Sequence, residues 1–511
     1  MIPYGVKADL AVPALISIEN MKYNVTIGME VHAELKTESK MFCACKNGLG
    51  METTPNVNIC PVCTAQPGAL PVPNAAAIEA VQRVGLALGC TLRLNSKFDR
   101  KNYFYPDLPK GYQISQYDQP FCEAGTMVIG DKSFRITRIH LEEDTGKSMH
   151  PAGADYTLVD YNRAGVPLME LVTEPDFTNS KDVGMFCQQL RQTLRYLGAS
   201  NADMEKGQMR CEVNISLYPE GADRLSGTKV EVKNINSFRS VERAIEYEIV
   251  RQTEALENGE KLVQETRGWD ENKNATVSQR KKESAHDYRY FPDPDIPPFE
   301  FDAAYVERLR ATLPELPDAK RRRFVAEYGL PEKDVATLTE ERAFSEYFEA
   351  VATELAEKLK SGEMTAPLER AVKLAANYML TELRKYLTDN NQGIEDLPIK
   401  PENYAEFIGI VADGKINSSA AQTVLGEMYK NADGDTDPSH IIDRLNLGQV
   451  NDAEALEKSV DLVLERNEQS ITDFKAGEQN ALQYLMGQVM AETKGKANPK
   501  MVMELLRKKL V

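Results

Sequence analysis

The proline-rich segment 291–298 constrains the fold of this chain more than any other feature. It reads Phe-Pro-Asp-Pro-Asp-Ile-Pro-Pro, with four prolines in eight residues. Proline lacks a backbone N–H donor and fixes φ, so neither an α-helix nor a central β-strand can run through this segment. The residues before it show mainly strand periodicity, and those after it show helical patterns interrupted by prolines. The sequence therefore predicts an α+β protein with a β-rich region followed by helical regions.

Three runs before these prolines alternate between two faces, which is the period of a β-strand. In the run 27–35, apolar residues share one face, and Glu30, His32 and Glu34 share the other. Runs at 133–144 and 229–233 also predict strands. Residues two apart on a strand lie roughly 7 Å apart at Cα, so Glu30 and His32 can approach one ion. Exposed polar side chains on a half-buried strand explain the same pattern.

Polar residues also gather near 97–107, 140–147 and 162–170, as in a site for a nucleotide and a hard divalent ion, magnesium or manganese. Glu143 follows Ile139 and Leu141 on an apolar strand face, where a buried carboxylate needs a cationic partner. Alternatively, the strand ends there and residues 142–144 are solvated. The aromatic and basic run 97–112 suits either stacking on a base or packing in a core.

Helical spacing and capping residues predict helices at 74–89, 180–198 and 237–258. After the prolines, residues 300 to about 400 read as helices punctuated by prolines, and 405–511 read as a further helical unit. No run there has comparable strand periodicity.

Four cysteines, Cys43, Cys45, Cys60 and Cys63, form two close pairs separated by a polar arm. Two thiol pairs at this spacing predict a tetrahedral zinc site, and the alternative is four unliganded thiols. A closed four-thiolate shell leaves no position for substrate, so this zinc would be structural.

The composition limits the location and the partners of the chain. Eight cysteines in 511 residues, four of them clustered, fit a reducing compartment, and we expect a cytoplasmic protein. The apolar stretch 10–18 is too short and too interrupted for a signal peptide or a membrane span. A net charge of −17 excludes coating by nucleic acid over the whole surface. The last 18 residues carry +5 and suit local contact with a phosphate backbone, or simple solvation.

Several catalytic motifs are absent. Asp144–Ser148 is not a phosphate-binding Walker loop, because Leu141 stands where that motif needs glycine. We find no Gly-Ser-rich amidase signature, no nucleophile elbow and no GxGxxG fingerprint, so amide hydrolysis and dinucleotide binding have no local support.

Eight segments together carry a resemblance to a known family: 27–35, 97–107, 111–120, 140–147, 160–170, 209–214, 233–238 and 287–295. They resemble the B subunit of the bacterial and archaeal aspartyl/glutamyl-tRNA amidotransferase, over about residues 22–511. The resemblance implies a β-rich cradle-type catalytic domain, a helical domain and a small helical tail that binds tRNA. The corresponding ranges are 22–293 with a zinc arm at 43–63, then 294–404 and 405–511, after an N-terminal extension at 1–21.

The resemblance also implies an activity and its partners. ATP would phosphorylate the side-chain carboxylate of Glu-tRNA(Gln), Asp-tRNA(Asn) or both, and ammonia would displace the phosphate. Because the chain lacks an amidase signature, ammonia would come through an internal channel from an amidase-type A subunit, held with a small C subunit in a heterotrimer. ATP, magnesium and a structural zinc ion are the expected cofactors.

By similarity, the residues of the site fall into four groups. The expected magnesium ligands are Glu30, His32, Glu143 and Glu170, with Glu142, Glu205 and Glu212 as candidates for a second ion. Further candidate catalytic residues are Lys101 and Arg163. The expected nucleotide, phosphate or carboxylate contacts are Arg100, Lys147, Asn162 and Arg210. Lys101 and Lys110 are candidates for a polar ammonia path.

Two other functions compete with this interpretation. One is a non-catalytic, zinc-containing module that presents aminoacyl-tRNA to another enzyme. The other is a free-standing ATP-dependent carboxylate ligase for a small molecule, which would leave the basic tail without a purpose.

Overall fold

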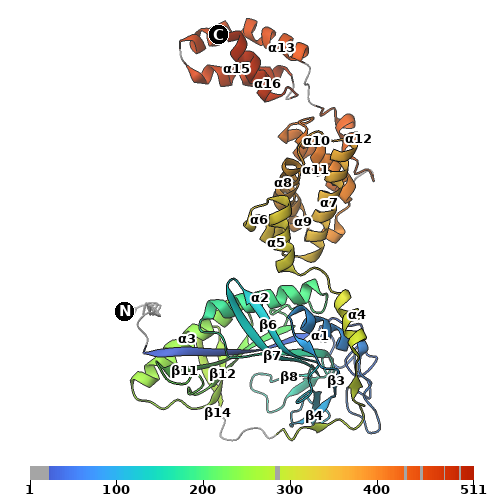
Figure 1. Ribbon diagram of the computed structural model, residues 1–511, viewed down its shortest axis with the longest axis vertical. Coiled ribbons are helices and arrows are strands. Elements are labelled where there is room, and N and C mark those ends of the chain that lie inside the picture. Colours follow the sequence, from blue (N-terminus) through green and yellow to red (C-terminus); the bar gives the residue numbers. More distant parts are fainter. Residues whose placement is uncertain are drawn as a thin grey trace, which may run out of the picture. The chain divides into compact units, whose positions relative to one another are not determined.

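The computed structural model describes residues 22–281, 288–430, 434–448, 453–476, 478–493 and 496–510. The chain divides into two compact units, Met1–Leu316 and Pro317–Val511 (Figure 1). Among the described residues, the first unit holds all the strands and the second is helical. The predicted α+β class is confirmed.

One large mixed sheet forms the centre of the first unit. Its strand order is β14-β13-β12-β11-β1-β10-β7-β6-β2. The bounds are β1 Tyr23–Glu34, β2 Thr91–Leu92, β6 Cys122–Ile129, β7 Lys132–Glu143, β10 Pro167–Thr173, β11 Met209–Pro219, β12 Val230–Ile235, β13 Glu265–Asp270 and β14 Ala275–Lys281. The predicted strands at 27–35, 133–144 and 229–233 are therefore confirmed as β1, β7 and β12.

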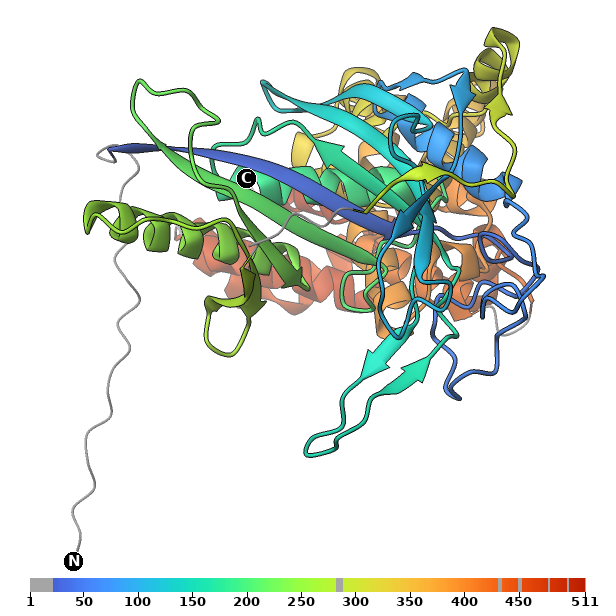
Figure 2. The same ribbon diagram turned by 90° about the horizontal axis from the view of Figure 1, so that it is seen from below.

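Smaller strands surround the sheet. They are β3 Asn95–Ser96, β4 Asp99–Asn102, β5 Tyr112–Ser115, β8 Lys147–Met149, β9 Leu158–Asp160, β15 Phe291–Pro292 and β16 Phe299–Glu300. Strands β15, β4 and β5 form one small sheet, and β16 pairs with β3. Strands β8 and β9 form a hairpin that extends away from the large sheet (Figure 2).

Helices cover the apolar face of the large sheet. They are α1 Ala75–Ala87, α2 Ser180–Tyr196 and α3 Phe238–Glu257, and Figure 1 shows α2 and α3 along the sheet. The side chains of Asn74 and Ser237 accept backbone N–H groups at the starts of α1 and α3, as predicted, whereas Asn179 rather than Ser180 caps α2. Ile27, Val31 and Phe186 are among the fully buried residues of this core. The opposite face is left to the polar residues that alternate with the apolar ones.

The segment after the prolines stays with the first unit. Strand β16 pairs with β3, and α4 Ala303–Ala311 contacts α1. The predicted domain ranges 22–293, 294–404 and 405–511 stay predictions. The predicted extension 1–21 and the stretch 10–18 lie outside the described residues.

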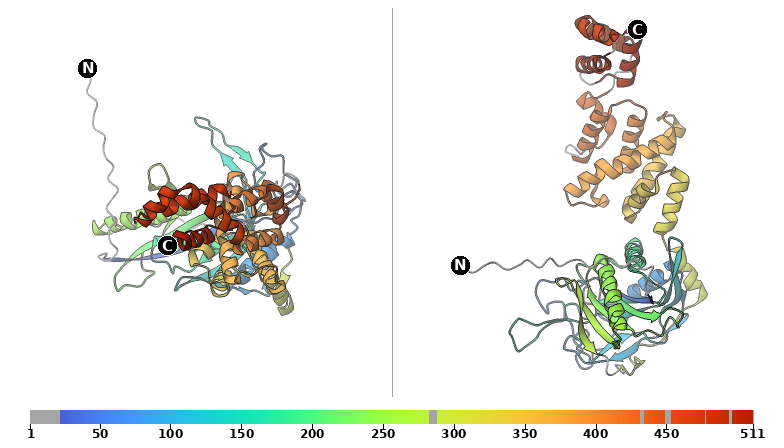
Figure 3. Two further views of the ribbon diagram at one scale, coloured as in Figure 1. Left: turned by 90° about the horizontal axis from the view of Figure 1, so that it is seen from above. Right: turned by 90° about the vertical axis from the view of Figure 1, so that its left-hand side faces the viewer.

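The second unit has two separate hydrophobic cores, one made of residues within 324–442 and one of residues within 456–510. Figure 3 shows the ribbons of the helices that carry them. Four helices of this unit, α5, α10, α12 and α16, begin at a proline. The described helices of the unit are α5 Pro317–Tyr328, α6 Glu332–Leu338, α7 Arg342–Ser361, α8 Leu368–Tyr378, α9 Arg384–Asp389, α10 Pro401–Ala412, α11 Ser418–Lys430, α12 Pro438–Leu445, α13 Ala453–Arg466, α14 Glu468–Lys475, α15 Gln479–Glu492 and α16 Pro499–Leu510, with short helical turns at Met379–Leu383 and Ile394–Asp396. In the described part of the chain, no helix has the length and apolarity needed to cross a membrane.

Candidate active site

Strand register brings imidazoles and carboxylates together on the polar face of the sheet. His32 on β1 lies opposite Glu170 on β10, which in turn lies opposite His140 on β7. The Nε2 atoms of His32 and His140 are 3.2 and 3.3 Å from Glu170 Oε2. Glu142, two residues beyond His140, has Oε1 3.9 Å from His32 Nε2. Glu142, Glu170 and His140 are buried, and His32 is mostly so.

The charges in this cluster depend on one another. Burial disfavours the charged form of His32, but the carboxylates of Glu170, Glu212 and Glu142 outweigh it and raise the pKa of His32 to about 9. Burial would raise the pKa of Glu170, yet the two imidazoles hold it well below its ordinary value. The pKa of Glu30 is raised by burial and by neighbouring carboxylates, Glu170 first. Negative charge therefore accumulates on this face.

His32, Glu142 and Glu170 fit a divalent ion. One ligand atom from each lies within 4.8 Å of the others. Two carboxylates and one imidazole are a donor set for magnesium or manganese with open positions left for phosphate oxygens. A cation would also relieve the negative charge that raises the pKa of Glu30.

Glu30 lies beside this cluster and belongs to a second acidic group. Its partners are Glu212 and Glu231, with one oxygen from each within 4.8 Å. Lys233 Nζ is 2.9 Å from Glu212 and 3.5 Å from Glu231, so an ammonium already compensates part of this charge. Asn214 donates to Glu30 Oε1 at 2.9 Å. Glu205, the other candidate for a second ion, is exposed on the loop before β11.

Glu143 does not join the other expected magnesium ligands. Its Oε1 lies 2.7 Å from Lys110 Nζ and accepts from the backbone N–H of Ile114 at 3.0 Å. The pair lines a pocket of about 200 Å³ together with Phe42, Val62 and Cys63. Glu142 takes the place in the cluster instead. Strand alternation gave the signal, because Glu142 shares a face with His140 and Glu143 does not.

Lys101 lies close to the cluster, among aromatic rings. Its Nζ is 5.1 Å from the centroid of Tyr288 and 6.0 Å from that of Tyr103. Burial would lower the pKa of Lys101, but the Glu142 carboxylate and its neighbours raise it overall. Lys101 is therefore an ammonium held beside the carboxylates.

The remaining predicted phosphate contacts already bond to protein groups. Arg210 Nη2 is 2.7 Å from Asp144 Oδ2, and Arg163 donates to the carbonyls of Thr145 and Gly146. Arg100 pairs with Asp293 and Asp295, at 2.8 Å each, and lies over Tyr112. Lys147 donates to the Gly50 carbonyl, and Asn162 bonds the carbonyl of Thr54 and the N–H of Asn58. Lys147 and Asn162 thus hold the cysteine-bearing arm, whereas the arginines hold loops of the site.

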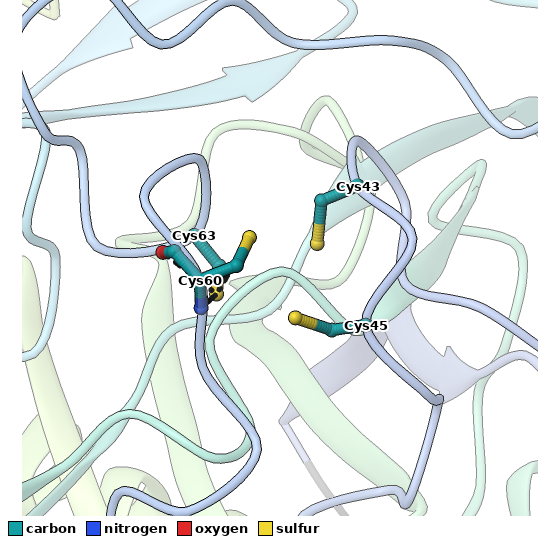
Figure 4. Close-up of side chains that lie close together, drawn as sticks. All are labelled: Cys43, Cys45, Cys60 and Cys63. Atoms are coloured by element: carbon teal, nitrogen blue, oxygen red, sulfur yellow. Dashed lines mark hydrogen bonds between the residues drawn. The ribbon is translucent and has the colours of Figure 1, made fainter.

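The four clustered cysteines converge as predicted (Figure 4). Their sulfur atoms all lie within 4.8 Å of one another, which suits a tetrahedral ion. The thiol of Cys43 and the backbone of Cys60 outweigh burial and lower the pKa of Cys63 to about 5, which favours a thiolate ligand.

The basic tail is only partly neutralised. Lys509 pairs with Glu457 and Asp461, at 2.8 and 2.6 Å. Lys500, Arg507 and Lys508 are exposed, and Lys494 lies outside the described residues.

Comparison with known proteins identifies the family. The GatB/GatE catalytic domain family matches residues 25–307, and the GatB domain family matches residues 363–510. A relative from Caldanaerobacter subterraneus subsp. tengcongensis, named as the B subunit of an aspartyl/glutamyl-tRNA(Asn/Gln) amidotransferase, is 45% identical over 494 residues, 96% of this chain and 100% of the relative. The chain belongs to this family of amidotransferase B subunits. Relatives of the same name from Thermodesulfovibrio yellowstonii and Myxococcus xanthus are each 46% identical, over 96% of this chain and 99% and 98% of their own lengths.

Family membership confirms the expected resemblance and the enzyme class, a tRNA-dependent amidotransferase. The relatives align over nearly their whole lengths, so the match includes both the sheet and the helical regions.

Proposed function

We propose that this chain supplies the site for ATP-dependent amidation of an amino acid esterified to tRNA. A side-chain carboxylate oxygen of Glu-tRNA(Gln) or Asp-tRNA(Asn) attacks the γ-phosphorus of ATP, and the bond from that phosphorus to the bridging oxygen breaks, releasing ADP. Ammonia then attacks the acyl carbon, the C–O bond to phosphate breaks, and the nitrogen loses a proton to give the amide and inorganic phosphate. The name of the relatives, which gives both tRNAs, supports this reaction.

The cluster of His32, Glu142 and Glu170 is the observation that carries the proposal. These residues would hold magnesium, which when bound screens the charges of the substrate carboxylate and the triphosphate. Glu30 borders the cluster and adds to its negative field. Lys101 presents a half-buried ammonium near Glu142, where it would attract a carboxylate or the transferred phosphoryl group.

We propose a positioning role for Arg100, Lys147, Asn162, Arg163 and Arg210. Each bonds to protein atoms of a neighbouring loop. The contacts of Arg163 and Arg210 would fix the turn after Glu143, and those of Lys147 and Asn162 would fix the arm at 43–63. Arg100 would fix the proline-rich segment through Asp293 and Asp295.

Ammonia would reach the site from partner subunits. The chain shows no amidase signature, and we propose an amidase-type A subunit and a small C subunit as its partners in a heterotrimer. In the pocket lined by Lys110 and Glu143, these two polar side chains would bind ammonia between apolar walls. Lys101 lies nearer to the carboxylates of the His32, Glu142 and Glu170 cluster and would be the next polar group on the ammonia path.

The cysteine cluster and the basic C-terminal tail would support the reaction without taking part in its chemistry. The clustered cysteines would bind a structural zinc, and exposed Lys500, Arg507 and Lys508 would contact the tRNA backbone. The cysteine usage continues to favour a cytoplasmic location.

Reconstitution with the A and C subunits tests the function on each misacylated tRNA. We expect Glu170→Gln to abolish tRNA-dependent ADP formation while the glutaminase activity of the partner persists. The exposed Glu205→Gln serves as a control for the same chemical change and should retain turnover. Unchanged ADP formation in Glu170→Gln would contradict the site assignment, and turnover without tRNA would favour a free-standing ligase.

A further inference from the structure

Lys40 is a fully buried lysine that none of the roles above includes. Its relative exposure is 0%, and its Nζ donates to the Asn58 carbonyl at 2.9 Å and lies 3.9 Å from Cys63 Sγ. In the described part of the chain, no carboxylate forms an ion pair with this ammonium. A buried charge is costly unless an opposite charge compensates it, so these contacts indicate an anion at the cysteine cluster.

Lys40 contacts both halves of that cluster. Its backbone N–H donates to the Cys45 carbonyl at 2.9 Å, in the first thiol pair, and its side chain reaches the second pair at Cys63. The Asn58 carbonyl that it also bonds lies two residues before Cys60. Lys40 therefore ties together the two chain segments that carry the proposed zinc ligands.

The same lysine packs against the wall of the pocket of about 200 Å³ that contains Glu143. Cys63 and Gly165 both line this pocket. Gly165 has φ of 84°, a conformation that favours glycine, and a Cβ atom there would lie 3.6 Å from Lys40 Cδ and 3.6 Å from Cys63 Cβ. The Gly165 carbonyl also accepts from the N–H of Met41 at 2.7 Å. The cysteine cluster, Lys40 and this pocket wall are therefore in continuous contact.

The charge of a filled cysteine cluster would explain why an ammonium is buried beside it. A zinc ion with four thiolate ligands carries about two net negative charges, and the Lys40 ammonium would compensate about half of that charge. Polar groups that contact metal ligands orient them and tune the affinity for the metal. A cation beside a sulfur atom also lowers the energy of the sulfur lone pairs by electrostatic attraction.

We propose that Lys40 is a positioning residue, which holds the Cys63 thiolate on the metal and joins the metal cluster to the pocket wall at Gly165. This inference rests on the proposed zinc site and extends it to a residue outside the ligand set. Through Gly165, the cluster would fix the wall past which ammonia is proposed to travel. A lysine that only stabilised the fold would leave the electronic spectrum of the metal–thiolate bonds unchanged.

Cobalt(II) in place of zinc tests this role, because its thiolate-to-metal charge-transfer band reports the energy of the sulfur lone pairs. The full chain would be compared with Lys40→Met, which removes the charge, with Lys40→Arg, which keeps it, and with Lys36→Met, at an exposed lysine of the same segment. We expect Lys40→Met to shift the band to longer wavelength and to weaken zinc binding by roughly tenfold to a hundredfold in competition with a chelator. Lys40→Arg should restore at least part of both properties, and Lys36→Met should match the unaltered chain.

Two further measurements do not depend on the cobalt spectrum. Hydrogen exchange at Met41, whose N–H donates to the Gly165 carbonyl, should be faster in Lys40→Met than in Lys36→Met, because the pocket wall loses its support. In the unaltered chain, acetylation of Lys40 by acetic anhydride should become faster when a chelator removes zinc, while that of the exposed Lys36 should not. This second measurement needs no variant, so it tests the role even if Lys40→Met fails to fold.

The outcomes separate the role of Lys40 from the zinc site itself. An unmoved band with unchanged zinc affinity in Lys40→Met would overturn the proposal, as would equal protection of Lys40 from acetylation with and without zinc. Absence of a cobalt–thiolate band from the unaltered chain would refute the zinc site together with this role. The amidation proposed for the carboxylate cluster would stand in either case, because none of its residues is changed.

Discussion

Glu142 and Glu143 are consecutive on β7, yet their carboxylates meet different partners. Glu142 has Oε1 3.9 Å from His32 Nε2, and its Oε2 accepts from Ser115 at 3.0 Å. Glu143 Oε1 lies 2.7 Å from Lys110 Nζ. This division supports the proposals that Glu142 binds the metal and that Glu143 lies beside the ammonia path, so two adjacent substitutions can separate the functions.

The first prediction concerns divalent metal. Glu142→Gln should weaken binding of manganese to the full chain by roughly tenfold to a hundredfold or more, because it removes a proposed ligand. Glu143→Gln should leave that affinity within about threefold. Isothermal titration calorimetry measures both.

The same pair tests the ammonia path in the reconstituted complex. Glu143→Gln should lower the formation of amide from glutamine, because the charge that holds Lys110 is lost. If Glu142→Gln and Glu143→Gln lost manganese affinity equally, the proposal that the two carboxylates have different functions would be wrong.

The second prediction concerns zinc. The purified chain should contain about one zinc per chain, and a Cys60→Ser, Cys63→Ser variant should lose it. Hydrogen exchange at 43–63 should increase in that variant, because only hydrogen bonds such as those from Lys147 and Asn162 would then hold the arm. Cys90→Ala, a buried cysteine outside the cluster, should keep the metal. Zinc retained by the double variant would contradict the site.

Local patterns in the sequence were sufficient to predict the main strands and helices and part of the candidate site. Alternation in 27–35 placed Glu30 and His32 on one polar face of β1, and close spacing grouped the four cysteines. Both inferences depend on residues that are near in sequence or on a fixed period. The caps of α1 and α3 were predictable for the same reason.

Contacts between side chains on neighbouring strands could not be predicted from such local patterns. The bond between His140 and Glu170 depends on the register of β7 with β10, which no local period specifies. Strand alternation placed Glu142 on the face of His140, but the further contacts of the two carboxylates depend on β5, whose Ser115 and Ile114 meet one carboxylate each. The resemblance suggested Arg210 as a phosphate or carboxylate contact, whereas its pairing with Asp144, 66 positions away, could not be predicted from the sequence.

The third prediction concerns acid stability. The pKa of Asp176 is lowered to about 2, because hydrogen bonds from Arg135, and less strongly from Arg224, outweigh burial. A depressed carboxyl pKa contributes stability above the unfolded value of 3.8, and this is lost as the pH falls through about 2. Asp176→Asn should therefore lower the free energy of unfolding by about 1–2 kcal/mol at pH 7, a figure reduced because both arginines are substantially exposed.

That difference should shrink as the pH falls below about 4. Urea unfolding followed by Trp269 fluorescence at pH 7 and pH 3 measures it. The exposed Asp155→Asn makes the same chemical change and should differ little from the unaltered chain at either pH. A penalty for Asp176→Asn that grows on acidification would contradict the assignment.

The fourth prediction concerns the core beneath the site. Phe177 is fully buried, stacked on Phe134 with centroids 4.2 Å apart, and edge-on to Phe186 of α2 at 5.2 Å. Because it joins β7 to α2, Phe177→Ala should leave a cavity and cost about 3–5 kcal/mol in the free energy of unfolding. Phe104 is 86% exposed, so Phe104→Ala should change that energy by no more than about 0.5 kcal/mol. Urea unfolding of the full chain, read from Trp269 in the same unit, compares the two variants. A cost below about 1 kcal/mol for Phe177→Ala would mean that this aromatic contact does not support the sheet that carries the carboxylates.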